Sequence, residues 1–137
     1  MKKLFVVLVL VAFGFSMNSC KKYEDGPTLS LRSKSARLVN TWVIEKAMNA
    51  GIDVTSMYPT DYQLSIMKDN TYEIATNGLK ISGTWEFTED KEGLKLTQST
   101  TGTEFVYTIL MLKNKELTLS QTLQSETFTI YFVEKPE

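Results

Sequence analysis

Polar and apolar residues alternate one by one over much of the chain after residue 61. Between residues 81 and 87, isoleucine, glycine, tryptophan and phenylalanine alternate with serine, threonine and glutamate, and similar runs lie near residues 62–66, 71–75 and 126–133. When apolar residues occur at every second position, one face of the strand is buried and the other faces solvent. This pattern is typical of antiparallel strands. The pattern predicts strands over 38–47, 62–67, 71–76, 81–88, 93–98, 104–112, 115–120 and 126–133.

Short turn-forming segments separate these strands. Lys68-Asp69-Asn70 and Asn77-Gly78 are two of them, and such residues favour turns because they tolerate positive φ angles. Strands joined by short hairpin loops fit an up-and-down meander, and closing the meander removes its exposed edges. The sequence therefore predicts an all-β fold, a small closed eight-stranded up-and-down antiparallel barrel.

Two segments depart from this strand pattern. Residues 48–61 form a connection much longer than a hairpin needs, and long loops often carry lids and binding residues. Residues 29–36 are expected to form one helical turn, with Thr28 or Ser30 as its cap.

The N-terminus has the features of an export signal. Lys2 and Lys3 precede an apolar run, Leu4 to Phe15, which is too short to span a bilayer and is typical of a signal peptide. Cys20 follows the small residue Ser19. This arrangement resembles a bacterial lipoprotein signal, in which the cysteine becomes the acylated first residue and carries fatty acids such as palmitate. The alternative is an ordinary secreted protein with a free thiol at Cys20.

The resemblance divides the chain into a lipoprotein signal peptide (1–19), a lipidated N-terminus with a flexible tether (20–36) and a β-barrel domain (37–137). Lys21 stands where an aspartate would retain a lipoprotein in the inner membrane. The resemblance therefore implies an anchor in the bacterial outer membrane, and either the periplasmic face or the cell surface fits the sequence.

The amino-acid composition argues against several classes of function. The chain has 15 Lys and Arg against 16 Asp and Glu, no His and one Cys. A near-neutral charge argues against a nucleic-acid partner. The missing histidines and the single thiol argue against a disulfide, a zinc site and the usual general bases. We find no catalytic motif, and we expect a non-enzymatic protein without metal or cofactor.

Three motifs resemble bacterial lipocalin-like lipoproteins. Leu38-Val39-Asn40-Thr41-Trp42 is similar to the lipocalin Gly-x-Trp signature, with Asn40 in place of glycine. The run from Ser82 to Phe87, followed by Gly93-Leu94-Lys95-Leu96, and the later Asn114 to Leu119 look like the middle and the seventh strand of these proteins. The resemblance implies a barrel over about residues 37–133 with Trp42 closing one end. The lipocalin arginine near the last strand has no counterpart here except Lys135.

The inward-facing aromatic residues are the candidates for ligand contact. They are Tyr62, Tyr72, Trp85, Phe87, Phe105, Tyr107, Phe128 and Phe132. An eight-stranded barrel either fills its interior with side chains or holds one small ligand. Two functions remain open: a lipid-anchored binding protein, expected to be a monomer, for a small and largely apolar ligand, or an envelope interaction module whose loops bind a protein or glycan.

Overall fold

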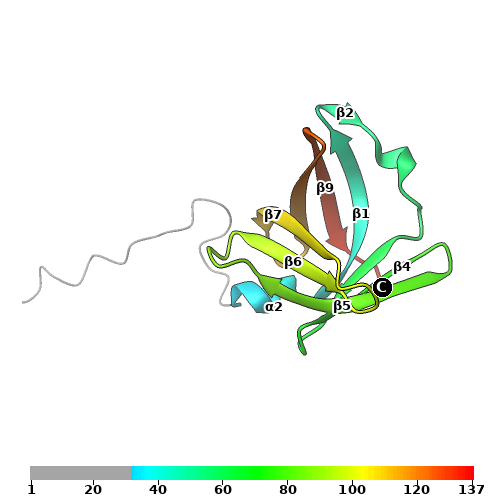
Figure 1. Ribbon diagram of the computed structural model, residues 1–137. Helices are drawn as coiled ribbons and strands as arrows, with labels where there is room; N and C mark the ends of the chain where they lie inside the picture. The colour runs from blue at the N-terminus through cyan, green and yellow to red at the C-terminus, as the bar shows by residue number, and fades with distance from the viewer. Residues whose placement is uncertain (1–31) are drawn as a thin grey trace, which may run out of the picture. The chain divides into compact units, whose positions relative to one another are not determined.

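The computed structural model describes residues 32–137, so the predicted signal peptide, Cys20 and most of the predicted tether lie outside the described residues. Figure 1 shows a curved antiparallel sheet with one short helix. The elements are α2 (Lys34–Leu38), β1 (Asn40–Asn49), β2 (Ile52–Asp53), the 3₁₀ turn η1 (Thr55–Met57), β3 (Gln63–Ile66), β4 (Thr71–Thr76), β5 (Leu79–Phe87), β6 (Gly93–Gln98), β7 (Glu104–Leu112), β8 (Glu116–Leu123) and β9 (Glu126–Glu134).

The sheet closes on itself. The strands pair in the order β2-β1-β3-β4-β5-β6-β7-β8-β9, and β1 also pairs with β9 from Trp42↔Glu134 to Asn49↔Phe128. Every pairing is antiparallel. Without the two-residue β2, the remaining strands form the predicted eight-stranded up-and-down barrel, which is confirmed.

β5 and β8 extend beyond their predicted limits because their hairpins pair up to tight turns. β5 begins at Leu79, which pairs with Thr76 across the predicted Asn77-Gly78 turn. β8 continues to Leu123, which pairs with Glu126. The turn residues have positive φ angles, 50° at Asn77 and 73° at Gly78.

The connection after β1 folds over one end of the barrel. β2 folds back on the end of β1 and forms a short antiparallel hairpin with it through the pairs Met48↔Asp53 and Asn49↔Ile52. The following turn η1 is fixed by Thr55, whose hydroxyl accepts a hydrogen bond from the Ala47 amide at 3.0 Å. This end, which we call the open end, also carries the β4–β5, β6–β7 and β8–β9 turns.

Helix α2 lies at the opposite end, beside the β5–β6 hairpin (Figure 1). Of the helical turn expected over 29–36, residues 29–31 lie outside the described residues, and the described helix spans Lys34–Leu38, where the Ser33 hydroxyl accepts a hydrogen bond from the Ala36 amide and caps it. The Lys34 ammonium donates to the carbonyl of Lys91, and the Arg37 guanidinium donates to the carbonyl of Leu112 at 2.9 Å. These contacts attach the helix to the barrel and define the closed end.

The core fills the part of the barrel nearest this helix. Trp42 is fully buried, and its indole N–H donates to the carbonyl of Leu38 at 2.9 Å. The other large buried residues packed with it are Leu38, Leu64, Ile66, Tyr72, Trp85, Leu94, Leu96, Leu117, Leu119 and Phe132. The interior at the closed end therefore has no room for a ligand.

Candidate ligand-binding site

A cavity opens into the barrel at the other end. Its volume is about 170 Å³. Residues from the long connection and from β7, β8 and β9 line it: Tyr58, Tyr62, Tyr107, Leu119, Gln121, Leu123, Phe128 and Ile130. We call this space the mouth cavity. Leu119 also belongs to the packed core, so the cavity begins where the filled part of the barrel ends.

A second hollow adjoins the first. It has a volume of about 160 Å³ and lies under the long connection, with Ile44, Thr55, Pro59 and Thr60 in its wall. Tyr58 and Tyr62 line both hollows. These two rings therefore separate the spaces, and a rotation of either side chain would change the shape of both.

The tyrosine side chains of this region lie in a poorly solvated environment. Burial raises the pKa of the Tyr107 phenol to about 12 and raises the pKa of Tyr62 still further, and the neighbouring tyrosines add to both effects. The pKa of Tyr58 is also raised by burial. A low dielectric disfavours the phenolate, so these hydroxyls stay protonated and neutral at physiological pH.

The structure divides the predicted interior residues into three groups. Tyr62, Tyr107 and Phe128 line the mouth cavity. Tyr72, Trp85 and Phe132 are buried in the packed core.

The third group is neither fully buried in the core nor part of the cavity wall. Phe87 is half-buried under α2, where its ring packs edge-on against Trp85 at 5.5 Å and the Lys34 ammonium lies 5.4 Å from its centre. Phe105 lies at the start of β7, is 38 % exposed, and is not part of the cavity wall. Cys20 lies outside the described residues.

Sequence reasoning missed several residues of the cavity wall. Gln121 and Leu123 lie beyond the predicted end of the strand over 115–120. Leu123 keeps the spacing of two that Leu117 and Leu119 set, but the polar residues Ser120 to Thr122 interrupt the alternation. Tyr58 lies on the long connection over residues 48–61, where the sequence predicts binding residues, and it lines the cavity.

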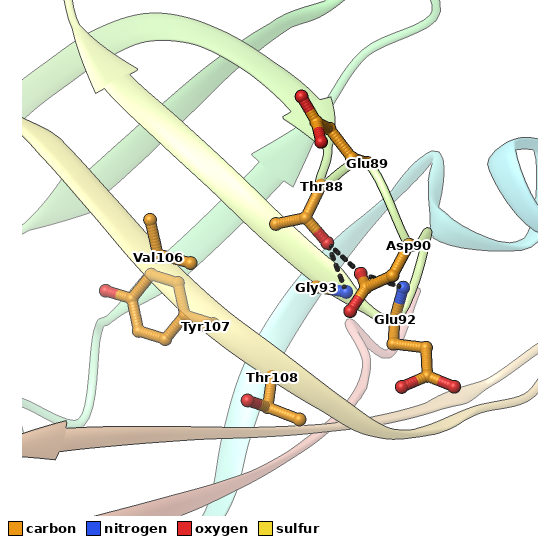
Figure 2. A pocket seen from close by; sticks show the side chains of 8 residues that line it. All are labelled: Thr88, Glu89, Asp90, Glu92, Gly93, Val106, Tyr107 and Thr108. Carbon is orange, nitrogen blue, oxygen red and sulfur yellow. Dashed lines mark hydrogen bonds between the residues drawn. The ribbon is translucent and has the colours of Figure 1, made fainter.

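A larger hollow of about 500 Å³ lies between the β5–β6 hairpin and β7 (Figure 2), and Tyr107 lines it as well as the mouth cavity. Gly93 leaves room there for the Thr88 side chain, whose hydroxyl accepts from the Gly93 amide and donates to Asp90 at 2.5 Å. Figure 2 shows these bonds at the hairpin, with Val106 and Thr108 on the neighbouring strand. The Asp90 carboxylate is solvated, and the Thr88 bond lowers its pKa. This open, acidic hollow has none of the enclosure of the mouth cavity.

Exposed apolar side chains surround the open end. Ile52 and Leu79 are each 68 % exposed, Met57 is 75 % exposed and Leu123 is 50 % exposed. They lie on the connection after β1, at the β4–β5 turn and at the β8–β9 turn. We call these four residues the apolar rim. Isolated surface apolar residues are ordinary, but a group around one opening indicates a contact surface.

Within residues 32–137, no three acidic or thiol side chains come together to hold a metal ion, and no helix there is both long and apolar enough to cross a membrane. Comparison of the sequence with protein-family models finds no match, and comparison with curated proteins finds none either. The barrel and its cavity are thus the observations from which a function must be argued.

Proposed function

We propose that this protein is a lipid-anchored, lipocalin-like binding protein that takes a small, largely apolar ligand into the mouth cavity. The observation that carries the proposal is the change along the barrel axis from a fully packed interior to a cavity of about 170 Å³. Aromatic rings and aliphatic side chains form most of its wall, with few polar groups. That composition is typical of small-molecule sites.

The size of the cavity limits the ligand. Drug-sized pockets begin at roughly 300 Å³, whereas an apolar cavity of about 150 Å³ takes a molecule the size of benzene. The mouth cavity therefore fits a single small ring or the end of a longer molecule. A ligand that also entered the adjoining 160 Å³ hollow would have to displace the Tyr58 or Tyr62 ring.

Toluene tests the cavity directly. The full-length protein in lipid nanodiscs should show saturable changes in the NMR signals of the Tyr107 and Phe128 rings when toluene is added. Gln121→Trp places an indole in the cavity and should weaken binding at least tenfold. Thr122→Trp on the same strand faces outward and is the control. Absence of saturation, or equal binding by both variants, would contradict the proposal.

The anchor is the second part of the proposal. Its support is the position of Cys20 directly after the apolar run and Ser19. In cells given labelled palmitate, the wild-type protein should incorporate label and fractionate with the outer membrane. Cys20→Ala should abolish both, and Ser19→Ala, which keeps a small residue before the cysteine, should preserve them. Unchanged labelling of Cys20→Ala would refute acylation at this residue.

The apolar rim favours a second candidate function, an interaction module that binds a protein partner through its loops. A photo-crosslinking residue at Met57, on the rim, should then give a discrete adduct in intact cells. The same residue at Lys91, on the closed end, is the control. No adduct from Met57, or the same adduct from both positions, would remove this candidate.

A further inference from the structure

The hydroxyl groups of the mouth cavity lack protein partners. Neither Tyr62 nor Tyr107 forms a hydrogen bond through its hydroxyl within residues 32–137. The fully enclosed side-chain polar atoms without a partner belong to Arg37, Asn49 and two threonines. The two tyrosine hydroxyls are therefore accessible and not sealed in the core, and both side chains line the mouth cavity.

Charged side chains are absent from the cavity wall. Within the described part of the chain, neither the mouth cavity nor the adjoining hollow is lined by a Lys, Arg, Asp or Glu. An anionic ligand would find no counter-ion in either hollow. Burial there disfavours charge on the tyrosines themselves, and the same low dielectric disfavours the charge of a bound carboxylate.

Because a ligand must displace water from the hydroxyl groups, its affinity depends on whether it can replace the hydrogen bonds of that water. In the empty cavity, water can bond to the exposed phenol groups and to the Gln121 amide. A purely apolar ligand that displaces this water leaves the buried groups unpaired, which lowers affinity. A ligand with an oxygen atom at the right place replaces the lost bonds. The wall can both donate and accept, because phenol and amide groups do both.

We propose that the mouth cavity selects a neutral ligand with a small apolar frame and at least one hydrogen-bonding oxygen, and that the hydroxyls of Tyr62 and Tyr107 bind this oxygen. Phenols, alcohols and ketones belong to this class, whereas fatty acids and other anions do not. The inference rests on the proposed ligand-binding function and narrows the ligand class of that same site.

Three probes of similar shape test the selectivity: toluene, p-cresol and benzoate. They are titrated against the full-length protein in lipid nanodiscs, with the NMR signals of the tyrosine rings as the readout and empty nanodiscs as the baseline. p-Cresol should bind about five- to tenfold more tightly than toluene, which is the effect of one net hydrogen bond. Benzoate should not saturate the site.

Two variants locate the hydrogen bond. Tyr62→Phe and Tyr107→Phe keep the rings and remove the hydroxyls, so p-cresol affinity should fall toward that of toluene, and toluene affinity should not fall. Tyr131→Phe is the control, because Tyr131 lies on β9 outside the cavity wall and is 36 % exposed. A thermal unfolding curve for each variant establishes that the barrel is intact.

The outcomes separate this inference from the function on which it rests. If none of the probes saturates the wild-type site, the proposed binding function fails and the inference fails with it. If toluene binds as tightly as p-cresol, or benzoate binds best, only the inference is overturned. Preference for tetramethylammonium, added as a fourth probe, would assign a cation site built from aromatic faces and would also overturn it.

Discussion

The two ends of this barrel are built from the same strands but have different interiors. At the closed end, Leu38 of α2 and Trp42 are completely buried, and the Trp42 indole N–H is bonded to the Leu38 carbonyl. At the open end, Tyr58, Tyr107 and Phe128 line a cavity beside the 3₁₀ turn η1. Side-chain packing at the closed end therefore stabilises the fold, whereas the interior at the open end contains the proposed ligand site.

The chemistry of the side chains follows this division. The closed end uses leucine and tryptophan, whose few polar atoms are satisfied, as in the 2.9 Å bond from the Trp85 indole to the carbonyl of Met67. The open end uses tyrosine and Gln121, which line the mouth cavity. Unpaired polar groups are costly in a sealed core, so tyrosine hydroxyls without a protein partner beside a cavity support the proposed ligand site.

The largest expected effect comes from Trp42→Ala. Truncating a fully buried tryptophan leaves a large void and an unpaired carbonyl at Leu38, and should lower the free energy of unfolding by about 3–5 kcal/mol. Phe128→Ala, which only enlarges an existing cavity at the open end, should cost less than half as much. Urea unfolding followed by far-UV circular dichroism measures both. Equal losses would show that the two ends contribute alike.

A smaller effect is expected at alkaline pH. The unfolded chain releases the Tyr107 proton near pH 10, whereas the folded protein holds it up to about pH 12. Between these values the unfolded state binds fewer protons, so the free energy of unfolding should fall with rising pH, by about 2–3 kcal/mol in all. Tyr107→Phe should lose less stability over this range than Tyr131→Phe. The same pH dependence in both variants would contradict the assignment.

The cap of α2 should have a moderate effect. Ser33→Ala removes the hydroxyl that accepts from the Ala36 amide at 3.2 Å, and loss of such a cap costs about 1 kcal/mol. Ser35→Ala, inside the same helix, should cost less because alanine favours the helical conformation. Thermal unfolding of the two variants makes the comparison. A larger loss from Ser35→Ala would mean that the cap is not what holds the helix in place.

Alternation was sufficient to predict the strands and the inward direction of most aromatic residues. It could not predict the division between the two ends, because a period of two fixes the face of a residue and not its distance along the barrel axis. The alternation predicts that Trp85 and Tyr107 both face inward, yet Trp85 is in the core and Tyr107 lines the cavity. Ser33 was not predicted as the cap of α2, since Ser30, Ser33 and Ser35 are all suitable cap residues by type and propensity alone does not choose among them.

The smallest effect on stability is expected at the apolar rim. Met57 is 75 % exposed, so Met57→Ser should change the free energy of unfolding by no more than about 0.5 kcal/mol. Leu119→Ser, at the floor of the cavity and 2 % exposed, is the matched control and should unfold the protein readily. A large loss from Met57→Ser would mean that the rim packs against the fold. A negligible loss would mean that these apolar side chains do not stabilise the barrel. Their position around the mouth would then favour contact with the proposed ligand or with a protein partner.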